Sequence, residues 1–341
     1  MNALQSAVKA LALGESLAGP QAQAAFEVVM AGEGTPSQIS ALLMGLRVKG
    51  ETPSEVAGAA AALRSAMTVL NVADADALVD TCGTGGGTIS TFNISTAAAL
   101  VAAGAGARVA KHGNRSFTSR SGSADVIEAL GVAIDVPVSQ MAQVLSEAGI
   151  VFMFAPTMHP AMRHVGPVRR EIAIPTVMNL VGPLANPARA GRQVIGVADP
   201  NRLELIAGAL ATLGTRHSLV VHGEPGLDEI SPMGRTTIIE ISRGEQQRWT
   251  LDPTDVGLTL ASAESLAGGS PEDNAALIEQ VLRGGGSLEA RSAVALNAAG
   301  AIYVGGLAAD YAGALALAQS VLQGGAGSDA LERLRKAAPR R

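Results

Sequence analysis

The sequence predicts an α/β protein in which a small all-helical domain precedes a larger α/β domain with a mostly parallel central sheet covered by helices. Residues 1–70 show helical patterns, whereas strand-like and helical runs alternate from about residue 78 onward, as in parallel sheets covered by helices. With 341 residues, 48% of them hydrophobic, the chain is long enough for two or three domains with a sizeable core. We set the domains at 1–72 and 73–341, joined by a segment near 165–190.

Two capping boxes predict helices in the N-terminal part. They are Thr35-Pro36-Ser37-Gln38 and Thr52-Pro53-Ser54-Glu55. In each, Thr caps the helix, Pro occupies the first turn, and Gln or Glu reaches back to a free backbone N–H. Apolar residues follow at helical spacing, which indicates a small helical module.

Short apolar runs in the rest of the chain are predicted as strands, and helices separate several of them. The predicted strands are Leu78–Cys82, Arg108–Ala110, Val132–Val136, Ile150–Phe154, Val194–Ala198, Ser218–His222 and Thr236–Ile241. The predicted helices between them are 95–106, 123–130, 139–148 and 201–213, and helical patterns return from Ser270 to the C-terminus.

Composition excludes several classes of function. The formal charge of −5 argues against a nucleic-acid partner, which requires a basic face. The longest apolar stretches, such as 97–107 and 298–309, are shorter than the roughly 18 residues of a spanning helix. Cys82 is the single cysteine, so the chain forms no intrachain disulfide and suits a reducing compartment. We therefore expect a cytoplasmic protein without membrane or nucleic-acid partners.

A glycine-rich run follows the first predicted strand. Residues 80–88 read DTCGTGGGT and lead into a helix near Ser95. Glycines let backbone N–H groups approach an anion closely, and the helix N-terminus adds a favourable dipole. The run fits neither a Walker A loop nor the Rossmann fingerprint. Alone, it fits an ordinary strand–helix turn as well as it fits a phosphate loop.

A second motif follows the next predicted strand. Residues 111–115 read KHGNR, with Ser119 and the run SGSAD at 121–125 soon after. In a parallel sheet this motif emerges at the same edge as the glycine run. Lysine, arginine and hydroxyl groups gathered there indicate a site for a polyanion such as pyrophosphate.

With these motifs the sequence resembles anthranilate phosphoribosyltransferase, a family of tryptophan biosynthesis. Seven segments match in the family's order: GTGG at 83–86, TFNIST at 91–96, KHGNR at 111–115, GSADV at 122–126, HPAMRHVGPVRRE at 159–171, NLVGPLANP at 179–187 and GLDEIS at 226–231. The resemblance implies a nucleoside phosphorylase/phosphoribosyltransferase-like fold and a homodimer formed through the helical domain. It also implies transfer of the phosphoribosyl group of phosphoribosyl pyrophosphate (PRPP) to anthranilate, with one or two Mg²⁺ ions.

The resemblance also assigns site residues. The PRPP positions are Gly83, Gly86, Gly87, Thr91, Asn93, Ile94, Ser95, Thr96, Lys111, His112, Gly113, Asn114, Arg115, Ser119 and Ser123. The anthranilate positions are Gly83, Asn114, Arg169, His112 and His159. The magnesium positions are Ser95, Asp228 and Glu229. No dedicated catalytic residue is expected, because the aromatic amine is already neutral at pH 7 and positioning and electrostatics carry the reaction.

One position departs from the family pattern. Gly87-Thr88 follows GTGG where the family usually has Asp-Gly. The missing carboxylate would lie near the metal and the pyrophosphate, so the departure leaves the binding of a second metal ion open. Because Asp228 and Glu229 remain, we expect catalysis to persist.

Other interpretations stay open at this point. Taken alone, Asp228-Glu229 fits a solvated loop, and Arg169 fits an ion pair with Glu171 or another acid. The Gly- and Pro-rich segment Asn179–Pro187 suggests a rigid bend between the domains, with a hinge there as a hypothesis. The alternative functions are a pyrimidine-nucleoside phosphorylase and a non-enzymatic, nucleic-acid-binding relative of the transferase.

Overall fold

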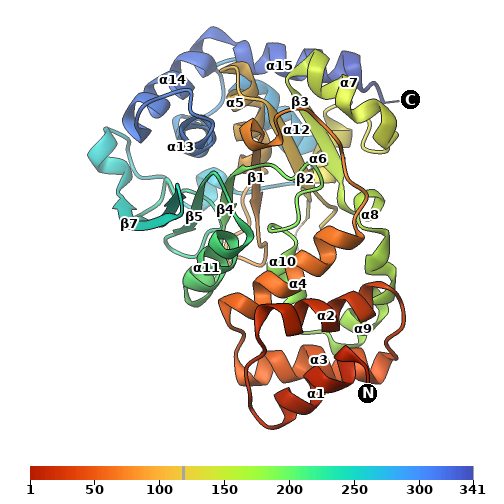
Figure 1. The fold of residues 1–341 in the computed structure, drawn as a ribbon. Helices are drawn as coiled ribbons and strands as arrows, with labels where there is room; N and C mark the ends of the chain where they lie inside the picture. Colours follow the sequence, from red (N-terminus) through yellow and green to blue (C-terminus); the bar gives the residue numbers. More distant parts are fainter. Residues whose placement is uncertain (117–119, 341) are drawn as a thin grey trace.

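The structure, a computed structural model, describes residues 1–116 and 120–340. The predicted PRPP residue Ser119 lies outside the described residues. Figure 1 shows a helical layer formed by the N-terminal part of the chain, below a sheet with further helices above it. This arrangement confirms the predicted fold class: a helical bundle joined to a larger α/β part with a mostly parallel sheet.

Four helices form the N-terminal bundle: α1 (Ala3–Ala12), α2 (Gly19–Met30), α3 (Pro36–Lys49) and α4 (Pro53–Ala66). Both capping boxes are confirmed. The Thr35 side chain accepts from the Gln38 N–H, and the Thr52 side chain accepts from the Glu55 N–H. Proline stands in the first turn of both helices, where no intrahelical N–H donor is needed.

The sheet has the order β3-β2-β1-β4-β5-β6-β7. Its strands are β1 (Val79–Gly83), β2 (Val109–Gly113), β3 (Ile150–Phe154), β4 (Arg192–Gly196), β5 (His217–Gly223), β6 (Thr236–Ser242) and β7 (Glu245–Leu251). The first five strands run parallel, and β6 and β7 add an antiparallel hairpin at one edge. Six of the predicted strands are therefore confirmed.

The predicted strand Val132–Val136 is wrong. Its residues connect two helices, and Val132 makes only an isolated bridge with Pro339. The alternation that suggested a strand reflects burial instead, because Val132, Ile134 and Val136 all turn into the core. A buried connection gives the same period of two as a strand with one covered face.

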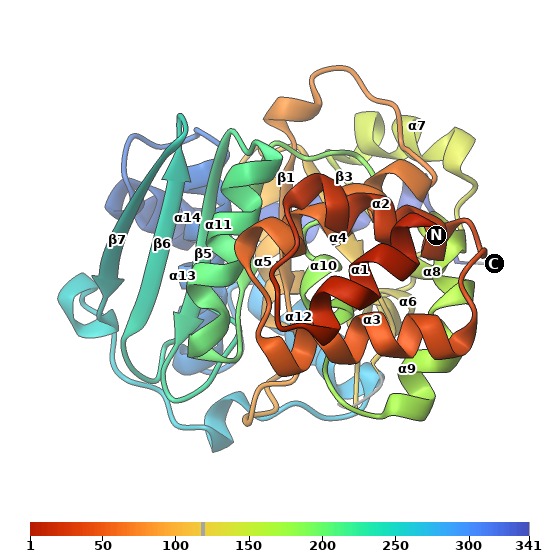
Figure 2. The same ribbon diagram turned by 60° about the horizontal axis from the view of Figure 1, so that its bottom comes forward.

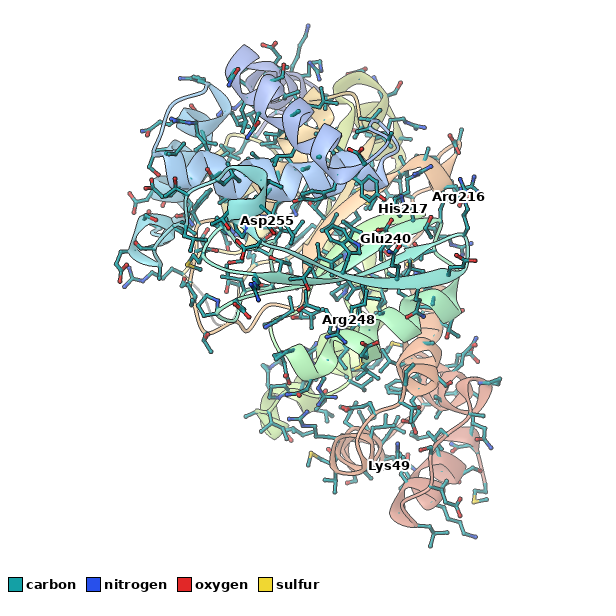
Figure 3. All side chains as sticks on the ribbon, turned by 90° about the vertical axis from the view of Figure 1, so that its left-hand side faces the viewer. Lys49, Arg216, His217, Glu240, Arg248 and Asp255 are labelled. Atoms are coloured by element: carbon teal, nitrogen blue, oxygen red, sulfur yellow. The ribbon has the colours of Figure 1, made fainter. Side chains whose placement is uncertain are left out.

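Strand β7 was not predicted, because five of its seven residues are polar or charged and most of them are exposed. The hairpin is attached to the α/β core through the Glu240 carboxylate on β6. This carboxylate accepts from His217 Nε2 (2.8 Å), Trp249 Nε1 (3.0 Å) and the Tyr303 hydroxyl (2.8 Å). Figure 3 shows His217 and Glu240 close together on the hairpin side of the sheet. Trp249 packs edge-to-face on Tyr311, as expected of a packing residue.

Helices cover both faces of the sheet. The helices that follow β1 are α5 (Ile94–Gly104), α6 (Ser123–Ala129), α7 (Val138–Ala148), α8 (Ala155–Met158), α9 (Gly166–Ile172), α10 (Met178–Val181), α11 (Leu203–Leu213), α12 (Pro271–Leu282), α13 (Leu288–Val304), α14 (Tyr311–Gly324) and α15 (Ala326–Ala337). Helices α5, α6, α7 and α11 confirm the helices predicted between the strands. No helix in the described ranges is long and apolar enough to cross a membrane.

The two faces of the sheet bury different cores. Val194 and Leu219 belong to a cluster with α5 and α13, whereas their neighbours Ile195 and Val220 belong to a cluster with α11 and the bundle helices. Successive residues of a strand point to opposite faces, so β4, β5 and β6 each contribute to both clusters. The helical bundle therefore forms part of the layer on one face, and Figure 2 shows it in front of the sheet beside α11.

Segment Asn179–Pro187 lies inside the second cluster. Leu180, Val181 and Leu184 are buried there with the bundle helices. The Asn186 side chain is buried too and donates to the Ala110 carbonyl (2.9 Å). This burial supports the expected rigid bend. The hinge stays a hypothesis.

Candidate active site

The strand order places a crevice at the carboxyl edge of the sheet. From β1 the chain adds β2 and β3 on one side, and then returns to place β4 on the other side of β1. Ligands of open α/β sheets bind where the order reverses in this way. Gly83 ends β1 and Gly196 ends β4, paired with each other at this point.

The loop carrying Asp228 fills the space beside these two glycines. A Cβ atom on Gly83 would lie 2.3 Å from Asp228 Oδ2, and one on Gly196 would lie 1.7 Å from the Asp228 carbonyl oxygen. The Gly85 N–H donates to Asp228 Oδ2 (2.8 Å). Any side chain at either glycine would displace this loop, so both glycines are needed to bring the carboxylate to the glycine run.

Glu229 reaches the first turn of α5. Its Oε1 accepts from the Ser95 N–H (3.2 Å), one of the N-terminal groups of a helix that have no intrahelical partner. Asp228 and Glu229 therefore occupy backbone donors that would otherwise be free to bind an anion. An anionic ligand arriving here meets two carboxylates, unless a cation compensates them.

The electrostatics of this pair favour a bound cation. Burial, followed by the negative charge of Asp228, raises the pKa of Glu229 to about 8. Burial also raises the pKa of Asp228. Both carboxylates and Ser95 line one small cavity, together with Thr81, Cys82, Ala98, Val194, Gly196, Val221 and Asn297. The three predicted magnesium residues thus face a common space, and their hard oxygen atoms suit Mg²⁺.

Lys111 lies beneath the glycine run and is only 2% exposed. Its ammonium donates to the Thr81 carbonyl (2.5 Å), and lies 3.3 Å from Thr81 Oγ1 and 3.4 Å from Ser95 Oγ. Burial lowers its pKa, whereas the charges of Asp80, Cys82 and Glu229 act in the opposite direction. The Lys111 Nζ atom therefore lies under Ser95 and does not extend into solvent.

The loop after β2 is held by helix α6. The Asn114 N–H donates to Ser123 Oγ (3.2 Å), and Ser123 begins that helix. The Arg115 guanidinium forms ion pairs with Asp125 and Glu128, both at 2.6 Å. The charge of Arg115 is thus compensated by acids of α6, although the side chain remains half-exposed.

Asn93 connects this second loop to the glycine run. Its side-chain oxygen accepts from Ser121 Oγ (3.1 Å) and from Asn274 Nδ2 (3.0 Å), and its amide donates to the Ser121 carbonyl (3.2 Å). The side chains of Ile94 and Thr96 are buried, so these two residues present only backbone to a ligand. Gly86 has a φ of +79°, in the left-handed region that favours glycine.

His112 and His159 form a separate buried pair. Their Nε2 atoms are 3.2 Å apart, and their ring centroids 5.0 Å. Burial lowers the pKa of His112 to about 3 and that of His159 to about 4. Both rings are therefore neutral at pH 7, with one nitrogen donating and the other accepting.

Arg169 lies on α9 and is half-buried. Among the described residues it takes part in none of the ion pairs, so the pair with Glu171 considered from the sequence does not form. Burial lowers the pKa of its guanidinium. A partly buried cation without an acid is available to a ligand's carboxylate.

The structure thus joins Gly83, Ser95, Lys111, Asp228 and Glu229 by direct contacts. His112 and His159 form a second group, and the hydrogen bonds and ion pairs of the described residues connect Arg169 to neither. Sequence reasoning assigned no role to Asp80 or Asn186. The signal for Asp80 was a charged residue inside an otherwise apolar strand.

Fold and site together define a glycosyltransferase of the type that combines a helical bundle with an α/β domain. The pattern of a glycosyl transferase family's a/b domain matches residues 75–328, and the pattern of its helical bundle domain matches residues 5–67. The chain is 49% identical over 319 residues to the anthranilate phosphoribosyltransferase of Herpetosiphon aurantiacus, covering 93% of this chain and 94% of the relative. It is 47% identical over 333 residues to that of Thermomicrobium roseum, covering 97% and 95%. The chain belongs to the anthranilate phosphoribosyltransferase family.

Solved structures agree with this assignment. The crystal structure of anthranilate phosphoribosyltransferase from Thermus thermophilus matches with a TM-score of 0.92 and 43% identity, covering 99% of both chains. The Saccharomyces cerevisiae enzyme in complex with PRPP and Mg matches with a TM-score of 0.88 and 27% identity, covering 98% of this chain and 97% of that one.

Proposed function

We propose that the protein transfers the phosphoribosyl group of PRPP to the amine of anthranilate. The products are N-(5-phosphoribosyl)anthranilate and pyrophosphate, in tryptophan biosynthesis. Family membership over nearly the whole chain supports this reaction. The structural observation that supports the proposed reaction most directly is that Asp228 contacts the glycine run and Glu229 contacts the start of α5.

Asp228, Glu229 and Ser95 would hold Mg²⁺, as one or two ions. The residues fit, because two partly buried carboxylates with raised pKa values gain from a cation, and because all three side chains line one cavity. Residues 1–116 and 120–340 contain no group of three His, Cys, Asp or Glu side chains able to hold a metal. The substrate and water would therefore supply the remaining ligands. When bound, Mg²⁺ neutralises negative charge on the departing pyrophosphate.

Backbone donors bind the phosphates of PRPP in this proposal. They come from Gly86 and Gly87. Gly83, the start of α5 and the loop 111–115 line the same site, but the Ser95, His112 and Asn114 N–H groups already donate to Glu229, Asp80 and Ser123. Lys111 contributes charge from below Ser95, and Arg115 contributes at the outer rim through its half-exposed guanidinium. Thr91, Asn93 and Ser123 complete the set, and Asn93 acts by holding the two loops together.

Anthranilate binds beside Gly83 and Asn114 in this proposal, and Arg169 binds its carboxylate. His112 and His159 line the approach as neutral rings, which suits an aromatic ligand better than charged ones would. The attacking amine needs no deprotonation, so alignment of the amine with the ribose C1 carries the rate. The proton lost by the amine after attack passes to water or to the departing pyrophosphate.

The proposal extends to assembly, domains and location. The helical domain, taken as residues 1–72 with 73–341 as the α/β domain, would form a homodimer. Leu13 and Val48 support this, since they are 69% and 81% exposed on the bundle. A Val48→Asp variant should then run as a monomer in light scattering. The single cysteine supports a cytoplasmic location.

An omission experiment tests the reaction. Anthranilate fluorescence is followed over time with protein, PRPP and Mg²⁺, leaving out one component at a time. A loss that requires all three supports the proposal. No loss with folded protein contradicts it, and phosphorolysis of thymidine or uridine and salt-sensitive DNA binding then become the functions to test.

A further inference from the structure

Strands β1 and β2 separate at the edge of the sheet that carries the site. β1 pairs with β4 at five positions, Val79 to Gly83, and β2 pairs with β3 at five positions. β1 and β2 pair only at Val79 and Val109. The parallel ladder between them therefore ends after one pair, although both strands continue. Backbone N–H and C=O groups inside a sheet need other partners where a ladder ends.

Three side chains supply these partners. Asp80 Oδ1 accepts from the His112 N–H (3.1 Å), Asn186 Nδ2 donates to the Ala110 carbonyl (2.9 Å), and Lys111 Nζ donates to the Thr81 carbonyl (2.5 Å). All three residues are buried. The separation of β1 and β2 is thus stabilised by specific contacts, because a polar side chain forms a hydrogen bond with each backbone group named here.

This separation determines where Lys111 lies. The lysine side chain crosses from β2 to the Thr81 carbonyl on β1 and approaches Ser95 Oγ (3.4 Å). Asp80 attracts the ammonium electrostatically. A closed ladder would leave Lys111 without access to the Thr81 carbonyl. Ser95 in turn lies in the first turn of α5, and its N–H donates to Glu229 at the site.

We propose that Asp80 and Asn186 are positioning residues for the pyrophosphate group of the substrate: they hold β1 and β2 apart, and thereby hold Lys111 beneath Ser95. Neither residue touches substrate in this assignment. The inference rests on the proposed function for its kinetic part only, since pyrophosphate binding can be measured without turnover.

The test compares Asp80→Asn with a matched control. Asn keeps an oxygen for the His112 N–H but removes the charge that faces Lys111. Glu55 is likewise a fully buried carboxylate that accepts from a backbone N–H (Leu17, 2.8 Å). It lies in the helical bundle and accepts directly from an ammonium (Lys49, 2.9 Å), whereas Asp80 acts on Lys111 through its charge. Glu55→Gln therefore removes the same chemistry away from the site.

The readouts are the KM for each substrate and the Kd for pyrophosphate with Mg²⁺ by titration calorimetry. Asp80→Asn should raise the KM for PRPP and the Kd for pyrophosphate about tenfold, equivalent to about 1.4 kcal/mol, and should leave the KM for anthranilate unchanged. Glu55→Gln should change none of the three. A general loss of folded protein would lower the apparent kcat and leave the KM values alone.

Asn186→Ala provides a second variant that keeps both charges and removes the donor to Ala110. If Asp80→Asn does not fold, Asn186→Ala carries the test with the same expected shift. Unchanged pyrophosphate affinity in either folded variant, or an equal loss in Glu55→Gln, would overturn the inference. Wild-type protein that binds pyrophosphate but does not consume anthranilate would contradict the proposed function and leave this inference standing.

Discussion

Two regions of the molecule bury carboxylates wholly or in part, and they treat them differently. In the helical bundle, Glu55 accepts from the Leu17 and Thr52 N–H groups, both at 2.8 Å, and from Lys49 Nζ at 2.9 Å. At the sheet edge, Asp228 and Glu229 accept from the Gly85 and Ser95 N–H groups, and neither has an ion-pair partner among the described side chains. Figure 3 shows Lys49 in the bundle, well away from the sheet.

The difference separates structural burial from functional burial. A buried acid with an ammonium and two backbone donors is compensated, so removing one partner would leave a buried group unpaired. Two adjacent acids without a cation are under-compensated, and their raised pKa values report that deficit. Such a deficit is tolerated where a ligand will supply the missing charge.

The largest effect should follow from removing both site carboxylates. Asp228→Asn combined with Glu229→Gln should lower kcat by about 10²- to 10³-fold, the scale of removing an electrostatic group from a catalytic site. Stability should not fall, because the amides keep an oxygen for the Gly85 and Ser95 N–H groups and remove two carboxyl groups whose charged forms burial disfavours. Steady-state kinetics and thermal unfolding check this. If the double variant lost as much stability as is expected for the removal of Glu55, these two carboxylates would have a structural role like that of Glu55.

Removing the compensated acid should have the opposite outcome. Glu55→Ala leaves Lys49 and two backbone N–H groups without their acceptor, and should cost about 3 kcal/mol of stability. Turnover per folded molecule should stay at the wild-type level. Urea unfolding measures the loss of stability, and activity normalised to folded protein measures the turnover per folded molecule. Lost turnover in fully folded protein would end the distinction between the two regions.

The same comparison applies to cations. Arg202 forms an ion pair with the buried Glu51 (2.5 Å), whereas Arg169 has no acid partner among the described residues. Arg169→Ala should raise the KM for anthranilate about tenfold, for the loss of one charge-assisted contact of about 1.4 kcal/mol. The control is Arg170→Ala, at the neighbouring, exposed arginine, which should leave the KM for anthranilate unchanged. A raised KM for PRPP alone would move Arg169 to the other substrate.

The last comparison concerns pH in the absence of metal. The pKa of Glu229 is raised from 4.5 to about 8, so the folded protein binds a proton that the unfolded chain has released. Its contribution to stability is present below pH 4.5 and is lost as pH rises towards 8. Relative to wild type, Glu229→Gln should therefore become more stable over this range. Parallel stability curves for the two proteins would contradict the raised pKa.

Local patterns predicted much of the fold. Capping boxes and apolar periodicity act within a few residues, so the helices α3 and α4 and six strands follow from them. Strand β7 was not predicted, because its polar side chains give no apolar pattern. Val132–Val136 was wrongly predicted as a strand, because the buried residues of this connection alternate as they would in a strand.

The site was predictable in part. The glycine run and the KHGNR motif indicate an anion site at one sheet edge through strand order alone. The contact of Asp228 with Gly83 joins distant segments, and only the family resemblance connected them beforehand. The charge of Asp80 inside a strand was visible in the sequence, but the roles of Asp80 and Asn186 could not be predicted, because they depend on where two strands separate.

The most direct test is titration of PRPP into the wild-type protein and into the Asp228→Asn, Glu229→Gln double variant, with and without Mg²⁺. If the two carboxylates are the group that a cation must compensate, wild-type protein binds PRPP only with Mg²⁺, and the double variant binds with an affinity that Mg²⁺ does not change. Equal dependence on Mg²⁺ in both proteins would contradict the account.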